Sequence, residues 1–309
     1  MRVGRILGGL VVLGLIGLGA FWFLTAPSTL DASVLKADYK PNLANGETMF
    51  TIGGCVSCHK TPGQTDRLKL GGGLGLASPF GTFYAPNISS DQANGLGGWS
   101  EIEFVNALMR GVGRHGEHLF PALPYTSYQH MKVEDVRDLW AYLKTVPAVA
   151  EPSKPHDVGF PFNIRRSLGG WKLLFVDQKP FVPDPAKSAQ WNRGAYLVEG
   201  PGHCSECHSP RNVIGGIKSA ERYAGGADPE GKGWVPNITP HADGIGSWKE
   251  ADIAEFLKTG MTPEFDSAGG SMAEVIENTS RLTDEDRAAM ANYLASLPPR
   301  PGKSPAKTP

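Results

Sequence analysis

Two short motifs contain all four cysteines of the chain. The first reads Cys55-Val56-Ser57-Cys58-His59 and the second Cys204-Ser205-Glu206-Cys207-His208, so both follow the pattern Cys-x-x-Cys-His. Two thiols at this spacing can form thioethers with the two vinyl groups of a porphyrin, and the adjacent histidine can ligate the iron. The motifs therefore predict two covalent c-type haems. Cys55, Cys58, Cys204 and Cys207 would attach them, and His59 and His208 would be the proximal iron ligands.

Other uses of paired cysteines fit the chain less well. Zinc-binding pairs usually lie about 15–20 residues apart, whereas Cys55 and Cys204 are separated by 149 positions. A thioredoxin-like redox pair would accompany a βαβ pattern, which the sequence lacks. Two disulfides would be ordinary in an oxidising compartment. The recurrence of the Cys-x-x-Cys-His pattern favours haem attachment over these alternatives.

The sixth iron ligand decides what each haem does. A methionine thioether favours reduced iron and raises the potential, as in electron-transfer cytochromes, whereas an open position favours catalysis or gas binding. In the second half of the chain, Met272 is the predicted ligand, in a loop before the last helix. Met261 is the alternative, and Met290 is assigned to core packing.

The first half lacks a methionine at the position that matches Met272, because Leu123 stands there. Met131, at the start of the last helix, is the predicted ligand of the first haem, and Met109 is assigned to packing. An open iron remains an alternative, as does ligation by one of three histidines: His115, His118 or His130.

The spacing of the motifs extends to other residues, which indicates an internal duplication. Trp99 and Trp248 are also 149 positions apart, and Pro86-Asn87-Ile88 recurs 150 positions later as Pro236-Asn237-Ile238. A period of this length corresponds to two whole domains rather than a solenoid.

Each half should contain three helices. The expected ranges are 46–52, 100–110 and 133–145 in the first half, and 194–198, 249–259 and 283–296 in the second. Thr283 is a plausible N-cap, and Pro147 and Pro298 end the last helices. The small residues Gly46 and Gly194 should let the first helix of each half cross the last one closely, near Tyr142 and Tyr293.

The N-terminus has the character of a membrane segment. An uncharged apolar stretch of 19 residues, 6–24, follows Arg2 and Arg5. This length can span about 30 Å of hydrocarbon, and the arginines should remain in the cytoplasm. A cleaved signal peptide is the alternative, but its apolar region is usually about 7–15 residues long. Either way, the remainder should lie in the periplasm, and an uncleaved anchor would hold it at the inner membrane.

Composition and charge complete this plan. Lys and Arg total 30 and Asp and Glu 31, without a basic run, so nothing indicates binding to nucleic acid. The expected parts are an anchor (1–27), a first domain (40–147), a proline-rich connector (148–189), a second domain (190–298) and a flexible tail (299–309). The connector should lie along a domain surface or between the domains rather than fold alone.

Over most of residues 40–298 the sequence resembles the membrane-associated cytochrome c subunits of periplasmic alcohol, aldehyde and gluconate dehydrogenases. The matching segments are Phe80-Gly81-Thr82, Pro86-Asn87-Ile88, Phe120-Pro121-Ala122-Leu123-Pro124-Tyr125, Pro161-Phe162-Asn163-Ile164-Arg165, Asn192-Arg193-Gly194-Ala195-Tyr196-Leu197-Val198, residues 203–211 and Met272-Ala273-Glu274-Val275. Two features depart from the family: those subunits typically carry three Cys-x-x-Cys-His motifs, and many have methionine in place of Leu123.

The resemblance implies a mainly α fold, with two tandem class I cytochrome c domains behind a transmembrane helix. It implies electron relay from a periplasmic dehydrogenase to quinone or a terminal oxidase, without catalysis by this chain, and it implies that Met272 is an iron ligand. It further implies that four residues line haem edges or propionates, namely Asn87, Asn237, Trp99 and Trp248; plain packing is the alternative for the tryptophans. The alternative function is a haem enzyme, such as a dihaem peroxidase or a thiosulfate-oxidising cytochrome.

Overall fold

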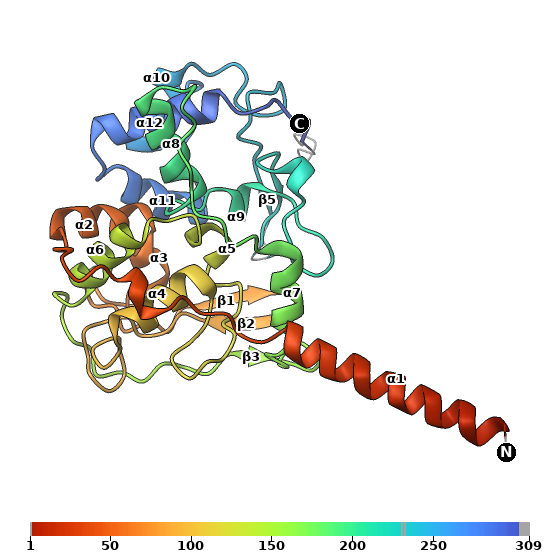
Figure 1. The fold of residues 1–309 in the computed structure, drawn as a ribbon. Helices are drawn as coiled ribbons and strands as arrows, with labels where there is room; N and C mark the ends of the chain where they lie inside the picture. The colour runs from red at the N-terminus through yellow and green to blue at the C-terminus, as the bar shows by residue number, and fades with distance from the viewer. Residues whose placement is uncertain (1, 230, 232, 303–309) are drawn as a thin grey trace.

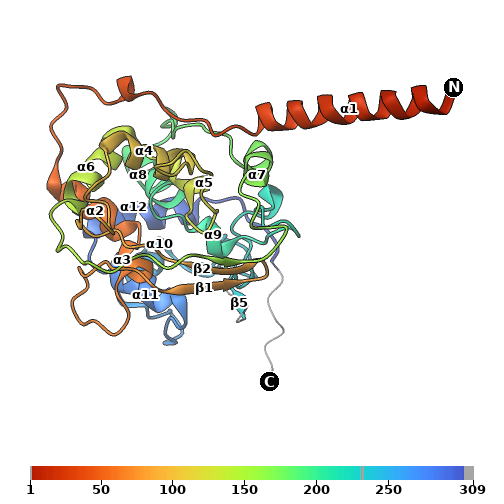
Figure 2. The same cartoon turned by 90° about the horizontal axis from the view of Figure 1, so that it is seen from below.

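The computed structural model describes residues 2–229, 231 and 233–302. The fold is mainly helical, and its body consists of two helical domains placed against each other (Figure 1). The first helix, α1 (Arg2–Leu24), projects alone from one side of the body, as Figure 2 also shows. The predicted mainly α architecture with an N-terminal apolar helix is therefore confirmed.

The first domain is built on the crossing of α2 and α6. Its helices are α2 (Leu43–Ile52), α3 (Cys55–His59), α4 (Glu101–Arg110), α5 (Tyr125–Tyr128) and α6 (Val133–Leu143). A Cβ atom at Gly46 would lie 2.2 Å from the backbone oxygen of Asp138 and 2.9 Å from Cβ of Tyr142. The predicted close crossing is present because Gly46 has no side chain.

The second domain repeats this arrangement. Its helices are α8 (Ala189–Glu199), α9 (Ser205–His208), α10 (Glu250–Thr259), α11 (Ser271–Thr279) and α12 (Asp284–Ala295). A Cβ atom at Gly194 would lie 1.9 Å from the backbone oxygen of Ala289 and 3.0 Å from Cβ of Tyr293. The hydroxyl of Thr283 accepts a hydrogen bond from the backbone N–H of Asp286, which confirms it as the N-cap of α12.

Short hairpins lie in regions that were expected to be loops. Strands β1 (Gly75–Ser78) and β2 (Gly81–Tyr84) pair antiparallel, and β3 (Asp157–Val158) from the connector extends the sheet beyond β2. Strands β4 (Gly226–Ala227) and β5 (Trp234–Val235) form a smaller hairpin in the second domain. Two 3-10 turns, at Ala32–Val34 and Ser219–Glu221, complete the elements.

The connector lies across both domains and contains a helix that the sequence did not predict. In α7 (Ser167–Phe175), the buried Lys172 ammonium donates hydrogen bonds of 2.7 Å to the backbone oxygens of Arg110 and Gly111, at the end of α4. The neighbouring Trp171 indole donates to the backbone oxygen of Ile214 in the second domain, at 2.9 Å. The predicted path along the domains is confirmed, and α7 joins them.

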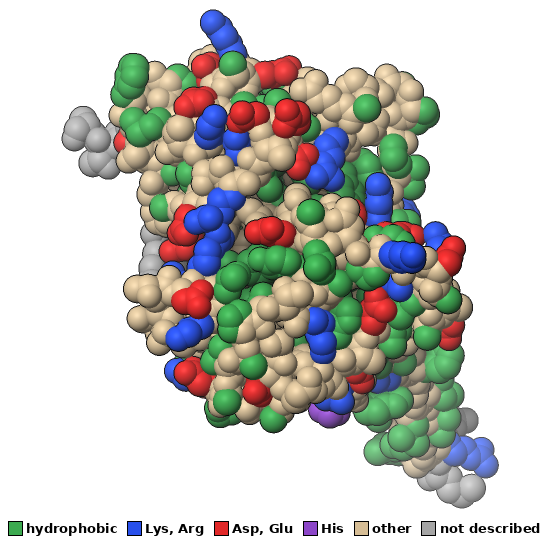
Figure 3. Space-filling model, turned by 90° about the vertical axis from the view of Figure 1, so that its left-hand side faces the viewer, with side chains coloured by type: hydrophobic (Ala, Val, Ile, Leu, Met, Phe, Trp, Pro, Cys, Tyr) green, Lys and Arg blue, Asp and Glu red, His purple; other side chains and the backbone are tan. Residues whose placement is uncertain are grey.

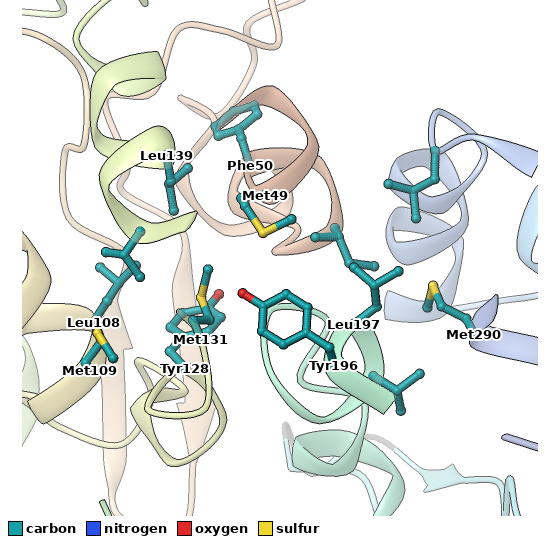
Figure 4. Close-up of a cluster of buried hydrophobic side chains, with 14 of the residues drawn as sticks. Met49, Phe50, Leu108, Met109, Tyr128, Met131, Leu139, Tyr196, Leu197 and Met290 are labelled. Atoms are coloured by element: carbon teal, nitrogen blue, oxygen red, sulfur yellow. The ribbon is translucent and has the colours of Figure 1, made fainter. Parts of the chain in front are cut away.

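A continuous apolar core passes between the domains. Figure 4 shows Tyr128 and Met131 of the first domain beside Tyr196 of the second. The Tyr196 hydroxyl accepts a hydrogen bond from the backbone N–H of Lys132 at 3.2 Å and donates one to the Asp135 carboxylate. The two domains therefore share buried surface as well as polar contacts.

The end of α1 is held by the body. Thr25 is buried, its carbonyl oxygen accepts a hydrogen bond from Nε2 of His118 at 2.9 Å, and its hydroxyl accepts one from Arg166 at 3.1 Å. The Arg166 guanidinium also lies 4.2 Å from the centre of the Trp22 ring. These contacts set the direction in which α1 leaves the first domain.

The first part of the expected tail is ordered. The backbone oxygen of Arg300 accepts a hydrogen bond from the Asn237 amide at 2.8 Å, and the N–H of Gly302 donates to Asp243 at 3.3 Å. Residues 299–302 therefore belong to the second domain, contrary to the expectation of a flexible tail from 299. Residues 303–309 lie outside the described residues.

Gly194→Ala should destabilise the protein, because its methyl group would overlap the α12 backbone at Ala289. Overpacking of this kind costs about 1–3 kcal/mol of unfolding free energy. Thermal unfolding followed by circular dichroism should show a lower midpoint. Gly269→Ala is the control, since its Cβ would meet nothing within 4 Å. Equal midpoints for the two variants would contradict the close crossing.

Lys172 should make stability depend on pH. Burial lowers its pKa to about 7 from an ordinary 10.5. Between these values the unfolded chain binds more protons than the folded one, so the lysine's contribution to stability rises with pH. It rises by up to about 1.4 kcal/mol per pH unit.

Denaturant unfolding at pH 7 and pH 9.5 measures this effect. Compared with Lys172→Met, the wild type should gain unfolding free energy as the pH rises, whereas Lys179→Met, at an exposed lysine, should follow the wild type. An unchanged difference between wild type and Lys172→Met would contradict the depressed pKa.

Candidate functional site

The first Cys-x-x-Cys-His motif forms the single-turn helix α3. Gly54, immediately before it, has a φ of 59°, which glycine adopts readily and which turns the chain from α2 into α3. Nδ1 of His59 donates a hydrogen bond to the backbone oxygen of Pro86 at 2.7 Å. This bond fixes the ring and leaves Nε2 as the nitrogen that can ligate a metal.

The second motif has the same geometry. Nδ1 of His208 donates to the backbone oxygen of Pro236 at 2.8 Å. Desolvation at both half-buried positions lowers the pKa of the His59 and His208 imidazoles, and the carbonyl partners oppose this shift. The neutral imidazole favoured in this way is the form that binds metals. The internal repeat identified Pro86 and Pro236, but it did not predict that their carbonyl oxygens accept the histidine hydrogen bonds.

Two of the motif cysteines are strongly desolvated. Burial, followed by the proximity of Cys58, raises the pKa of Cys55 to about 12. Burial, followed by the charge of Glu199, raises the pKa of Cys204 to about 12. Redox-active cysteines instead have lowered pKa values, because the thiolate is the reactive form. The environment therefore opposes a thioredoxin-like function for these pairs.

A cavity of about 2450 Å³ opens beside the motifs. Its wall includes Cys55, Cys58 and His59 of the first motif, and Cys207 and Gly225 of the second domain. Ordinary small-molecule pockets measure about 300–1,000 Å³. The volume and the adjacent thiols and imidazole suit a group as large as haem, and the cavity extends across both domains.

The two motifs begin next to each other. The ring of His203, which precedes Cys204, donates through Nε2 to the backbone oxygen of Gly53 at 3.2 Å. The Tyr128 hydroxyl donates to the same oxygen at 3.3 Å. Gly53 lies two residues before Cys55, so the starts of the two attachment motifs are joined by one hydrogen bond.

Glu206, inside the second motif, strengthens this junction. Its carboxylate is buried, pairs with Arg211 at 2.6 Å, and accepts hydrogen bonds from the hydroxyls of Thr126 and Ser127 in the first domain. Burial raises the pKa of this carboxyl, but Arg211 and the hydroxyl donors outweigh that effect, so the pKa is lowered overall. A charged Glu206 therefore fixes the second motif against α5.

The structure separates the candidate ligands of the first haem. Met131 is fully buried and lies in the cavity wall, together with His115 and Leu123. His118 is bound to the end of α1, and Nδ1 of His130 donates to the backbone oxygen of Lys179.

Two further methionines of the first domain are also buried. Met109 is packed in the core, as expected. Met49 on α2 also lies in the cavity wall and was not among the predicted ligands. Its position six residues before Cys55 was the available signal.

Met272 does not lie in a loop, as was expected, but in the first turn of α11. The apolar residues Met272, Val275 and Ile276 have helical spacing, and Gly270, with a φ of 56°, precedes the helix. Met272 and Ile276 share a helix face, and Ile276 packs against Gly260 in the second domain. Met272 therefore lies toward the second domain.

The remaining methionines of the second domain occupy different environments. Met261 is exposed at the end of α10, and Met290 is fully buried within α12. The assignment of Met290 to core packing is confirmed.

The asparagines implied to line haem edges donate their amides to the backbone, and Asn87 also lies in the cavity wall. The Asn87 amide donates to the backbone oxygens of Val149 and Glu151, at 2.7 and 2.8 Å. Its equivalent, Asn237, holds Arg300 in the same way. Both side-chain amides donate to backbone oxygens. In each domain this bond ties the residues after the proline to the chain that follows the last helix.

The tryptophans of the repeat differ from each other. Trp99 lies in the cavity wall, beside the first motif. Trp248 packs its ring against Phe256, with centroids 5.3 Å apart. Trp99 is therefore placed where a bound group could contact it, and Trp248 has the packing contact expected of a core residue.

Comparison with known proteins gives a consistent result. The family model described as Cytochrome c matches residues 43–147 and 191–298. A protein named diheme cytochrome c-type, from Cereibacter sphaeroides, is 45% identical over 292 residues, which cover 94% of this chain and 97% of that protein.

Dehydrogenase subunits also match. The fructose dehydrogenase cytochrome subunit of Gluconobacter japonicus is 40% identical over 264 residues, covering 84% of this chain and 53% of that subunit. The gluconate 2-dehydrogenase cytochrome c subunit of Pantoea cypripedii is 37% identical over 262 residues, covering 82% and 58%. The chain thus spans little more than half the length of these two subunits.

Proposed function

Because the chain belongs to the cytochrome c family, we propose that it is a dihaem electron carrier anchored in the inner membrane. Its two domains, 40–147 and 190–298, lie in the periplasm. It receives electrons from a dehydrogenase and passes them to the respiratory chain, to quinone or to a terminal oxidase. Its relatives are electron-transfer cytochromes, and accordingly it is a carrier rather than an enzyme.

The matched histidine–proline hydrogen bonds are the observation that carries this proposal. In each domain they orient an imidazole beside a pair of cysteines. Cys55 and Cys58 would attach one haem, with His59 as its proximal ligand; Cys204, Cys207 and His208 would do the same for the other. Haem c supplies a one-electron iron couple when bound. The chain fixes the axial ligands, excludes water and sets the distance between the sites.

The junction between the motifs supports electron transfer from one haem to the other. The hydrogen bond between His203 and Gly53 joins the starts of the two motifs, and the buried Glu206 prevents them from separating. The two attachment motifs would therefore hold their haems at a fixed separation. Electron transfer between fixed sites needs no domain motion.

Methionine is the proposed sixth ligand in both domains. Met272 lies toward the second domain on α11, and Met131 lies in the cavity wall of the first. A thioether ligand stabilises reduced iron and raises the potential. This favours electron transfer over reaction with peroxide.

Helix α1 supports the membrane location. Among the described residues, Val3–Leu24 is the segment long and apolar enough to cross a membrane, and none of it is buried in the body. Twenty-two residues suffice for about 30 Å of hydrocarbon, and Arg5 beside it favours a cytoplasmic N-terminus. An anchored carrier remains close to membrane-bound partners, which raises its effective concentration there.

A dehydrogenase is the proposed electron donor. The fructose and gluconate dehydrogenase subunits that match this chain are named as cytochrome subunits of those enzymes. The face of the body opposite α1 carries interspersed acidic and basic side chains, with apolar side chains near its middle (Figure 3). A surface of this kind suits a specific partner better than attraction to one sign of charge.

Expression with a cytochrome c maturation system should give a product with the mass of two covalent haems and a reduced α-band. The double variants Cys55→Ala/Cys58→Ala and Cys204→Ala/Cys207→Ala should each retain one haem. Intact-mass spectrometry and a haemochrome assay measure the stoichiometry. A product without covalent haem would refute the proposal, and peroxide turnover at a five-coordinate iron would favour the enzyme alternative.

Replacement of each ligand methionine should change one haem only. Met131→Leu and Met272→Leu preserve volume, so they should cost less than about 1.5 kcal/mol of unfolding free energy. Each should remove the sulfur–iron charge-transfer signature of one haem and lower its potential. Met109→Leu and Met290→Leu are matched controls and should change neither haem. If Met131→Leu leaves both spectra unchanged, another group ligates the first iron.

A further inference from the structure

Large apolar side chains are exposed on the body beside the inner end of α1. We call these six residues the apolar collar: Phe160, Ile164, Leu173, Leu174, Val213 and Ile214. The most exposed are Val213 at 94%, Phe160 at 81% and Leu174 at 69%. Extended exposed apolar surface of this kind usually marks an interaction site.

The collar is one surface made from two segments of the chain. The Trp171 indole donates to the backbone oxygen of Ile214, which holds the 213–214 loop against α7. The ring of Phe175 lies directly over Gly216, where a Cβ atom would be only 2.3 Å from it. Phe160 and Ile164 lie in the segment that leads into α7.

The collar continues from the end of the membrane helix. The ring of Phe21 lies 3.7 Å from the Cβ position of Gly170 on α7. Leu173 and Leu174 follow Gly170 by three and four positions, so they share its helix face. The Arg166 guanidinium stacks on Trp22, and its Nε bonds Thr25.

Helix α7 lies at the inner end of α1. Figures 1 and 2 both show α7 beside this end and out of line with the α1 axis. Leu173 and Leu174 are exposed on α7. If α1 spans the bilayer, these side chains lie at the level where α1 leaves the hydrocarbon.

The residues where α1 meets α7 have the chemistry typical of the lipid headgroup region. A tryptophan at the end of an apolar helix, such as Trp22, is typical of the membrane–water interface. Arg166, immediately before α7, contacts this end of α1 through Trp22 and Thr25. Apolar side chains at this level are stabilised by insertion into the boundary between headgroups and acyl chains.

We propose that the apolar collar inserts into the periplasmic leaflet of the bilayer that α1 spans. The inference rests on the proposed function, since it requires α1 to be an anchor. The collar gives the body a second membrane contact and prevents it from pivoting about Thr25. Leu174, Val213 and Ile214 also line the large cavity, so insertion of the collar would hold that part of the cavity at the membrane surface.

Photoreactive lipids test the proposal on the full-length, haem-loaded chain in nanodiscs. The nanodiscs contain a phospholipid with a diazirine in its acyl chain, and peptide mass spectrometry locates the adducts. Adducts should form in α1, in residues 160–175 and in residues 213–214, but not around the exposed Phe265. Phe160→Ser/Leu173→Ser, at collar residues outside the cavity wall, should reduce the adducts on residues 160–175 several-fold. Phe265→Ser, at an exposed apolar residue of the second domain, is the control and should not.

The outcomes separate this proposal from the function on which it rests. Adducts in α1 alone, with two haems bound, would overturn the collar's insertion and leave the anchor intact; the collar would then be available to a protein partner. An absence of adducts in α1 would overturn the anchor. Two-haem content in the serine variants shows that a loss of adducts does not result from misfolding.

Discussion

The hydrogen bond from a histidine ring to a proline carbonyl is the constraint on which both sites depend. An imidazole on a single-turn helix could rotate, but the bonds from His59 to Pro86 and from His208 to Pro236 each fix one ring. The proline segments must in turn be immobile. Asn87 and Asn237 ensure this, because their buried amides tie each segment to the chain beyond the last helix of its domain. The ring orientation therefore depends on the closure of the whole domain.

Direct contacts also fix the two domains relative to each other. Two independent sites would suffice for two haems, yet the second motif is bonded directly to the first domain through His203 and Glu206. Glu206 occupies one of the two variable positions of Cys-x-x-Cys-His, so the second attachment motif is itself part of the interface. Helix α7 adds a further connection, with Lys172 bonded to the first domain and Trp171 to the second. A carrier that transfers electrons internally benefits from this rigidity, since the separation of the sites does not vary.

The features predicted correctly from the sequence are those with a clear local residue pattern. The features missed depend on contacts between residues distant in sequence. The crossing of the first and last helices was predicted because glycine is the residue that permits such an approach, and Gly46 and Gly194 recur in the duplication. The N-cap Thr283 and the middle helices had clear patterns. The hairpin β1–β2 and helix α7 were missed because their segments are rich in glycine, short and held by partners distant in sequence. The roles of Pro86 and Asn87 were missed for a related reason: a carbonyl acceptor leaves no trace in residue type, and a buried amide can bind a cofactor or backbone equally well.

The duplication is least symmetrical at the distal side of the sites. In the second domain, α11 presents Met272 on the face that carries Ile276, within a helix of nine residues. The corresponding part of the first domain is the four-residue α5, preceded by Leu123, and the buried methionines in the cavity wall are Met49 and Met131. Met131 lies at the seam, where its Cγ would be 3.8 Å from a Cβ atom at Gly200 of the second domain. The first site therefore lies against the second domain. The second domain in turn contacts the first through Glu206, which accepts from Ser127, and through Asn278 of α11, which donates to the Ser57 hydroxyl inside the first motif. The two halves differ on their distal sides because the four-residue α5 stands where the second domain has the nine-residue α11.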